Sequence, residues 1–205
     1  MTDWILSRGD EEEEEKEEKD SGSVNAKLQE ALLKSRTVLI FGEINDKLAR
    51  STVGQLLALA AMDEEAPIKV IVSSPGGHVE SGDAIADTIK FIKPPVQVIG
   101  SGWVASMGVI IYLAADKGHR FSLPNTRFMI HQPAGGALGR AADIEIEARE
   151  ILKVRERLNK IIADATGQKL DKVAEDTDRN FWMSAEEAKD YGIAGKIIHS
   201  ASDLD

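Results

Sequence analysis

The residue best suited to covalent chemistry in this 205-residue sequence is Ser106. It stands between an apolar, strand-like segment and an apolar helical one, beside Ala105 and two residues before Gly108. A serine at a sharp strand-to-helix turn exposes its hydroxyl at a helix N-terminus, where the helix dipole favours developing negative charge. A helix-capping serine is the simpler interpretation of A-S-M-G taken alone. The local sequence therefore leaves a nucleophile and a cap both open.

His131 is the second candidate, because it follows the apolar segment 127–130 and precedes Gln132 and Pro133. A histidine just beyond a strand end can act as a general base, although a hydrogen-bonded structural histidine fits the pattern equally well. His78 follows the double glycine and could lie near the site or equally on the surface, whereas His119 and His199 are less suggestive, and no two histidines have the spacing of metal ligands. We therefore predict no metal site.

Gly76 and Gly77 follow the apolar strand-like segment 68–72 and Ser74-Pro75. Two glycines free the backbone to turn N–H groups outward, as an oxyanion hole requires. A simple turn is the alternative explanation. Taken together, the sequence offers a nucleophile, a base and anion-binding amides at three separate places.

The elements that must position these residues alternate between strands and helices. The pattern predicts strands at 37–41, 68–72, 96–99, 127–130 and 197–198. It predicts helices at 26–33, 48–62, 79–92, 107–115 and 144–165, and a last helix capped by Ser184 and ending at Gly192. Such alternation indicates an α/β domain with mostly parallel pairing, in which chemistry gathers at the carboxyl ends of strands.

Two rival patterns are weak. Residues 100–105 match the glycine pattern of dinucleotide sites, but Trp103 stands where the backbone must approach a pyrophosphate closely. Residues 94–115 lack charge over a length that could span a membrane, but their prolines and glycines favour a buried strand, a glycine-rich turn and a helix. The sequence also lacks a phosphate-binding GxxxxGK[ST] loop.

Charge and composition narrow the function further. The chain has 25 Lys and Arg against 35 Asp and Glu, a net charge of −10, and residues 10–20 hold nine of the acids and two lysines. We predict a flexible acidic segment at 1–25 and one domain at 26–205. A near-neutral body without a basic cluster disfavours nucleic-acid binding. The absence of cysteine excludes disulfides and thiol nucleophiles, and the N-terminus does not resemble a secretion signal.

Several ordered motifs together resemble the ClpP family of serine peptidases. They are S-P-G-G (74–77), A-S-M-G (105–108), P-N-T-R-F-M-I-H-Q-P (124–133), D-I-E-I-E-A-R-E-I-L-K-V (143–154) and F-W-M-S-A-E-E-A-K-D-Y-G (181–192). The resemblance runs from about residue 32 to residue 198. It implies the ClpP/crotonase-type α/β fold, built of repeated strand-strand-helix units with a protruding handle helix.

The resemblance also implies roles for individual residues. The family's nucleophile falls on Ser106, its general base on His131, and its oxyanion-hole donors on the N–H groups of Gly77 and Met107. The third catalytic position, an aspartate in the family, is Asn180 here. An asparagine can accept the imidazole N–H but supplies no charge to stabilise the imidazolium.

Two residues close to Asn180 in the sequence bear on this departure from the family's aspartate. Asp178 lies two residues before Asn180 and would share its face in an extended segment, so it could substitute if the backbone permits. Arg179 falls where the family has an arginine that forms ion pairs between rings. The resemblance therefore implies that Arg179 is an oligomer contact.

The family also implies partners. The chain would assemble into two stacked seven-membered rings, alone or with a ClpP paralogue, enclosing a chamber that degrades unfolded polypeptides. A Clp/Hsp100 ATPase would supply the ATP-driven unfolding, so this chain would need no cofactor. The complex would be cytoplasmic, without nucleic-acid or membrane partners. The acidic segment would then act as a flexible gate or interaction arm, if it is more than a solvated tail.

Three functions follow. The first is a Ser-His-Asn serine endopeptidase. The second is a weakly active or inactive structural ring subunit that pairs with an active paralogue, which Asn180 favours. A crotonase-type acyl-CoA enzyme is more distant, because the pair of Ser106 and His131 favours a peptidase.

Overall fold

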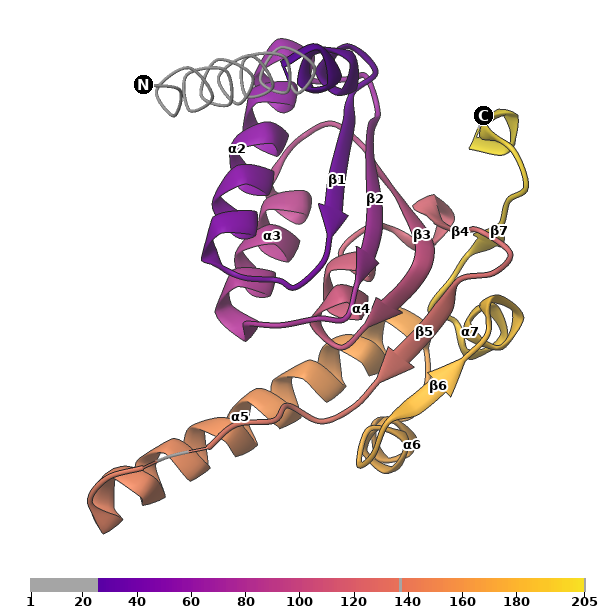
Figure 1. Cartoon of the computed structure of the whole chain (residues 1–205). Helices are drawn as coiled ribbons and strands as arrows, with labels where there is room; N and C mark the ends of the chain where they lie inside the picture. The colour runs from indigo at the N-terminus through magenta and orange to yellow at the C-terminus, as the bar shows by residue number, and fades with distance from the viewer. Residues whose placement is uncertain (1–25, 137, 205) are drawn as a thin grey trace, which may run out of the picture. The chain divides into compact units, whose positions relative to one another are not determined.

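The computed structural model describes residues 26–136 and 138–204, so the acidic segment expected at 1–25 lies outside the described residues. The chain divides into two compact units, residues 1–37 and 38–205. In the first unit, residues 26–34 are helical. The second unit holds the alternating strands and helices that the sequence predicts (Figure 1).

The strands are β1 (Thr37–Phe41), β2 (Ile68–Ser74), β3 (Val96–Ala105), β4 (Arg120–Ser122), β5 (Arg127–Ile130), β6 (Phe181–Met183) and β7 (Lys196–Ile197). The α-helices are α2 (Asp46–Met62), α3 (Val79–Phe91), α4 (Met107–Tyr112), α5 (Ala141–Thr166), α6 (Leu170–Asp176) and α7 (Ala185–Tyr191). Short 3₁₀ helices cover Lys117–His119 and Ala201–Leu204.

The sheet follows the order β1-β2-β3-β4-β7, and β5 pairs with β3 and with β6. The pairs of β2 with β3, β3 with β4 and β5, and β4 with β7 are parallel, whereas β5 and β6 are antiparallel. The predicted α/β fold with mostly parallel pairing is confirmed. The carboxyl ends of β2, β3 and β5 therefore lie at one edge, where the candidate residues follow them.

Alternation of side chains explains how β2 joins the core. Ile68, Val70, Val72 and Ser74 are buried, and the residues between them are half-buried. This period of two turns one face of the strand toward the interior. Helices α2, α3 and α4 cover that face (Figure 1) and supply buried leucines and isoleucines to the main core.

The predicted glycine-rich turn after residue 99 is wrong, because β3 continues through Gly100 and Gly102 to Ala105. Tertiary contacts keep this segment extended: residues 98–100 pair with β4, and residues 103–105 pair with β5. A Cβ on Gly100 would lie 3.2 Å from the rings and methyl groups of its neighbours, so glycine permits this close packing. The uncharged stretch 94–115 forms β3 and α4, and the described residues contain no helix that is long and apolar enough to cross a membrane.

Helix α5 runs out from the sheet as a long arm (Figure 1), and the protruding handle is confirmed. Its C-terminal part buries Leu158 and Ile162, whereas Ile144, Ile146 and Leu152 are exposed. The amphipathic stripe therefore packs against the core at one end only.

A buried arginine joins the ends of two helices. Arg120 is 5% exposed, and its guanidinium donates to the carbonyls of Leu113 (3.2 Å), Ala115 (2.7 Å) and Ala165 (2.9 Å). These carbonyls lie at or just beyond the C-terminal ends of α4 and α5, where helices leave acceptors unpaired. Burial lowers the pKa of the Arg120 guanidinium, but its ordinary pKa is high enough that it stays charged.

Replacing Arg120 with methionine removes this shared cap and leaves three carbonyls without their donor. We expect Arg120→Met to lower the free energy of unfolding by at least about 2 kcal/mol, measured by urea denaturation. Arg149→Met is the control, because Arg149 contacts only Glu145 among the ion pairs of the described residues and is exposed on α5. A change there within about 0.5 kcal/mol is expected. Equal effects of the two substitutions would contradict the capping role.

Candidate active site

Ser106 occupies the turn between β3 and α4 in a strained backbone conformation, with φ 54° and ψ −122°. Positive φ is costly for a residue with a Cβ, and such residues occur at functional turns. The Ser106 N–H donates to the Met129 carbonyl on β5 at 2.8 Å, and the Ser106 carbonyl accepts from the Val109 N–H at 2.9 Å. The side chain makes no capping hydrogen bond to α4, so the structure does not support the helix-cap interpretation.

The strained turn packs directly against the double glycine. A Cβ on Gly76 would lie 2.6 Å from the Ser106 Cβ and 3.0 Å from its Oγ, and Gly76 itself has a φ of +97°. Both the space and the backbone conformation therefore require glycine at this position. The sequence anticipated free backbone here, but the contact with Ser106 is visible only in the structure.

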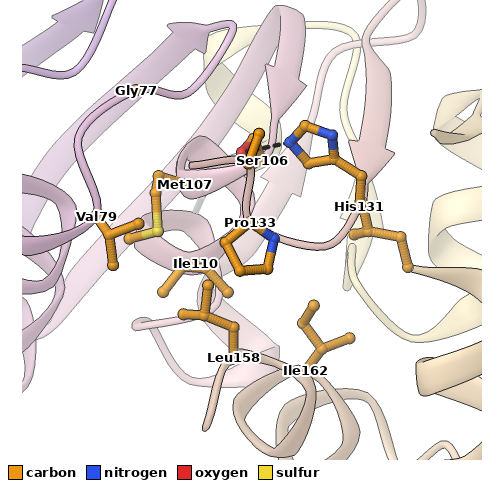
Figure 2. A pocket seen from close by; sticks show the side chains of 11 residues that line it. Gly77, Val79, Ser106, Met107, Ile110, His131, Pro133, Leu158 and Ile162 are labelled. Carbon is orange, nitrogen blue, oxygen red and sulfur yellow. Dashed lines mark hydrogen bonds between the residues drawn. The ribbon is translucent and has the colours of Figure 1, made fainter. Parts of the chain in front are cut away.

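His131 lies between two hydrogen-bond partners. Its Nε2 is 2.8 Å from the Ser106 Oγ, and its Nδ1 is 3.0 Å from the Asn180 Oδ1 (Figure 2 shows the contact with Ser106). An amide oxygen can only accept, so Nδ1 carries the proton and Nε2 is left free to accept from the serine hydroxyl. Ser106, His131 and Asn180 thus form one continuous chain of hydrogen bonds.

Pairing between β5 and β6 brings Asn180 to the histidine. Ile130 and Phe181 are register partners in this antiparallel pair, so the residues just outside them, His131 and Asn180, meet at its end. The preceding turn is held by the Gln132 N–H, which donates to the carbonyl of the buried Thr177. Three register pairs between β5 and β6 thereby bring Asn180 to His131, although 49 residues separate them in the chain.

Asp178 does not take the place of the missing aspartate. Its carboxylate is 3.3 Å from the Arg155 guanidinium and 3.4 Å from Gln132 Nε2. The side chain thus faces α5, whereas the neighbouring Asn180 faces the imidazole. Arg179, between them, is exposed at the surface.

The N–H groups of Gly77 and Met107 have no hydrogen-bond acceptor among the described residues. The Gly76 carbonyl accepts from the Ile44 N–H at 2.8 Å. Since the C=O and N–H of a trans peptide point in opposite directions, the Gly77 N–H of that same peptide points away from Ile44. Both Gly77 and Met107 line the cavity that holds the serine hydroxyl, so their amides are available to a ligand there.

Beside the serine is a small cavity of about 130 Å³ (Figure 2). Apolar side chains from α3, α4, β5 and α5 line it together with Pro133. They are Val79, Met107, Ile110, Ile130, Leu158 and Ile162. Except for Met107, whose N–H the family resemblance had already assigned, sequence reasoning missed these residues, because they come from four separate elements and each looks like an ordinary core residue.

The remaining histidines lie outside this site. His78 contacts Asp46, Glu80 and Ser81, and His119 ends a 3₁₀ helix. Across residues 26–136 and 138–204, no group of three or more His, Cys, Asp or Glu side chains is arranged to hold a metal ion.

Comparison with known proteins gives consistent matches. The Clp protease family model matches residues 19–201. Proteolytic subunit 3 of the ATP-dependent Clp protease from Rhizobium etli is 60% identical over 173 residues, 84% of this chain and 89% of that protein. Proteolytic subunit 2 from Gluconobacter oxydans is 56% identical over 200 residues, 95% of this chain and 89% of that protein. An Asn-to-Asp mutant of ClpP1 from Listeria monocytogenes superposes with a TM-score of 0.81 at 56% identity, covering 87% of this chain and 99% of that structure.

The contact between Gly76 and Ser106 yields a test of the site's geometry. Because alanine at position 76 combines a left-handed backbone with a clash against Ser106, we expect Gly76→Ala to lower the free energy of unfolding by about 2 kcal/mol or more. Urea denaturation measures the change. Gly136→Ala is the matched control, since a Cβ there meets nothing within 4 Å, and it should alter stability by less than about 0.5 kcal/mol. A tolerated alanine at position 76 would contradict the packing described above.

Proposed function

The chain belongs to the Clp protease family, a family of serine peptidases, and on that premise we propose that it is a serine endopeptidase that cleaves unfolded polypeptides. The observation that carries the proposal is the continuous chain of hydrogen bonds from Ser106 through His131 to Asn180. A nucleophile, a base and a residue that orients the base are the parts that acyl transfer requires.

The first half of the reaction acylates the serine. Ser106 Oγ attacks the carbonyl carbon of the scissile peptide bond while its proton passes to His131 Nε2, 2.8 Å away. The carbonyl oxygen becomes an oxyanion. His131 then gives the proton to the leaving amine as the C–N bond breaks, and the N-terminal part of the substrate remains esterified to Ser106.

The second half repeats these steps with water. His131 takes a proton from a water molecule as the water oxygen attacks the ester carbonyl. A second oxyanion forms and collapses, the ester bond breaks, and the proton returns to Ser106 Oγ. The released product is a carboxylic acid, so the enzyme ends in its starting state. No cofactor enters either half.

In both halves the developing oxyanion would accept from the N–H groups of Gly77 and Met107. The Gly77 N–H points away from Ile44, because the carbonyl of the same peptide accepts from Ile44, and this direction supports the assignment for Gly77. Met107 is the first residue of α4, so its amide adds the partial positive charge of a helix N-terminus. Loss of one such donor typically costs about 10²–10³ in turnover.

The apolar cavity beside Ser106 would bind the side chain that precedes the cleaved bond. Leu158 and Ile162 lie on its α5 side, and Ile110 comes from α4. Its lining contains no Asp, Glu, Lys or Arg. We therefore expect cleavage after apolar residues of moderate size.

Asn180 sets the level of activity in this proposal. Its Oδ1 fixes the productive tautomer of His131 but carries no charge to stabilise the imidazolium. The amide can also turn its NH₂ toward Nδ1, which would favour the unproductive tautomer. In chymotrypsin-type enzymes the Asp-to-Asn change costs about 10⁴ in turnover. This is the basis for the alternative function, a weakly active or inactive ring subunit paired with an active paralogue.

A fluorophosphonate probe and a single substitution test both versions. We expect the probe to label Ser106 in the wild type and not in Ser106→Ala. In Asn180→Asp, the carboxylate accepts only from Nδ1–H and adds charge, so kcat on a peptide with an apolar residue before the cleaved bond should rise about tenfold or more. Fluorogenic peptide hydrolysis measures this.

The outcomes separate the candidates. Labelling of Ser106 with slow turnover that Asn180→Asp increases supports the endopeptidase with a damped triad. Absence of labelling in the full chain, alone and mixed with an active paralogue, contradicts the endopeptidase and favours the structural subunit. Equally fast hydrolysis by wild type and Asn180→Asp would contradict the damping.

We further propose that the chain self-associates into two stacked seven-membered rings, alone or with a ClpP paralogue, and works in the cytoplasm with a Clp/Hsp100 ATPase. The names of the relatives, proteolytic subunits of ATP-dependent proteases, support the ATPase partner. The exposed apolar residues of α5 support self-association, because an arm with Ile144, Ile146 and Leu152 in solvent gains by burial. Arg179, exposed beside Asn180, is the proposed ring contact. The proposed peptidase domain is 26–205, preceded by the acidic segment 1–25.

A charged substitution on α5 tests the proposed assembly into rings. We expect Ile146→Glu to shift the chain from a tetradecamer to smaller species in analytical ultracentrifugation, since burying an unpaired carboxylate in an apolar contact is costly. Ile146→Leu keeps the apolar surface and should leave the assembly unchanged. If Ile146→Glu still sediments as the wild type does, α5 does not form the contact.

A further inference from the structure

A polar network outside the triad joins the first turns of α2 and α3. The hydroxyl of Ser81, on α3, is 2.6 Å from the Asp46 Oδ1 on α2, and it is 2.8 Å from the His78 Nδ1. The His78 Nε2 is 3.1 Å from the Glu80 carboxylate. Ser81 is 4% exposed, whereas the side chains of Asp46, Glu80 and His78 are largely exposed. The network is therefore anchored on a buried hydroxyl.

The direction of each hydrogen bond follows from the atoms present. A serine hydroxyl has one proton, and the Asp46 carboxylate can only accept, so Ser81 donates to Asp46. The Ser81 oxygen must then accept from His78, which places a proton on Nδ1. The three side chains thus form one directed chain from imidazole to hydroxyl to carboxylate.

This side-chain network lies beside the peptide that carries the proposed oxyanion donor. Ile44 donates its N–H to the Gly76 carbonyl and accepts at its own carbonyl from the His78 N–H, both at 2.8 Å. Gly77 lies between these two bonds, and a Cβ on it would come within 2.2 Å of the Ile44 carbonyl oxygen. Backbone hydrogen bonds to Ile44 therefore hold the loop on both sides of Gly77, and the side-chain network joins residues 46, 78 and 81 just beyond.

The network itself does not reach the substrate cavity. Gly77 and Val79 line that cavity, but Asp46, His78 and Ser81 do not. The Gly77 N–H points away from Ile44, whereas the His78 N–H points toward it, so the two amides face opposite sides of the loop. The three side chains can affect catalysis only by holding the loop.

We propose that Asp46, Ser81 and His78 are positioning residues that fix the direction of the Gly77 N–H toward the oxyanion. The inference rests on the proposed serine-peptidase function. The loop that contains Gly76 and Gly77 has glycine at two successive positions, which have more backbone freedom than other residues, and the side-chain network adds a restraint to the two backbone hydrogen bonds with Ile44. An N–H group that rigid neighbours hold in the right direction stabilises the oxyanion without reorganisation, whereas an N–H group on a mobile loop stabilises it less.

Ser81→Ala in the full chain is the principal test, with Asp46→Asn as a second variant on an exposed side chain. Because the donor matters only once the oxyanion forms, we expect Ser81→Ala to lower kcat about tenfold with KM unchanged. Affinity for a peptide boronate, whose tetrahedral adduct on Ser106 mimics the oxyanion, should fall by a similar factor. Asp46→Asn keeps an acceptor oxygen but can also turn its NH₂ to Ser81, so a smaller loss is expected. Ser51→Ala, which removes an exposed hydroxyl from α2, is the matched control and should behave as wild type.

Each outcome has one meaning. Parallel losses of kcat and boronate affinity at unchanged KM, with Ser106 still fully titrated by fluorophosphonate, support the positioning role. If both variants keep kcat within about twofold of the wild type, or if kcat falls while boronate affinity does not, the role is overturned. Should Ser81→Ala fail to fold, the same criteria apply to Asp46→Asn alone. A wild type that fluorophosphonate does not label contradicts the proposed function itself, and the positioning role with it.

Discussion

The close approach of two turns governs this active site. The strained turn at Ser106 lies so near the double glycine that a single added carbon on Gly76 would overlap the serine side chain. The approach brings the serine hydroxyl and the Gly77 amide to the same cavity, although 29 residues separate them in the chain. Parallel pairing of β2 and β3 makes this possible, because it places the carboxyl ends of both strands at one edge of the sheet. The strain at Ser106 is thus held by the packing around it.

Antiparallel pairing supplies the other half of the site. Strand β6 runs back along β5, so the residue that follows β5 and the residue that precedes β6 meet at one end of the pair. His131 and Asn180 are those residues. Only the backbone register determines which side chain faces the imidazole, and it selects Asn180 over the charged Asp178, which pairs with Arg155 instead. The fold therefore places position 180 against His131, the sequence puts a neutral asparagine there, and the nearby carboxylate of Asp178 faces Arg155 instead.

The geometry of the site and the rate that it can support depend on different features. The distances from His131 to its two partners are those of an assembled site. In the proposed mechanism, the neutral Asn180 supplies no charge to stabilise the imidazolium when it forms, so its effect would fall on the transition state rather than on the resting geometry. The proposed slow turnover would therefore come from the chemistry of Asn180 and not from a disordered site.

Much of the architecture could be read from the sequence, for a local reason. Alternating apolar residues identify β2, the wider helical stripe identifies α5, and Ser184 with Glu187 forms the capping box that starts α7. Such patterns depend on neighbours within a few positions. Short β4 and β6 and helix α6 were missed, because three to seven residues carry too little periodicity to detect.

The sequence alone also determined the candidate chemistry, since residue type and order single out Ser106, His131 and the double glycine. Three matters were decided by tertiary structure: that Asn180 and not Asp178 meets His131, that the glycine-rich stretch stays extended as part of β3, and that residues from α4, α5 and β5 enclose an apolar cavity. Each depends on contacts between segments far apart in the chain. Pairing register and packing set such contacts, and no local pattern of residues encodes them.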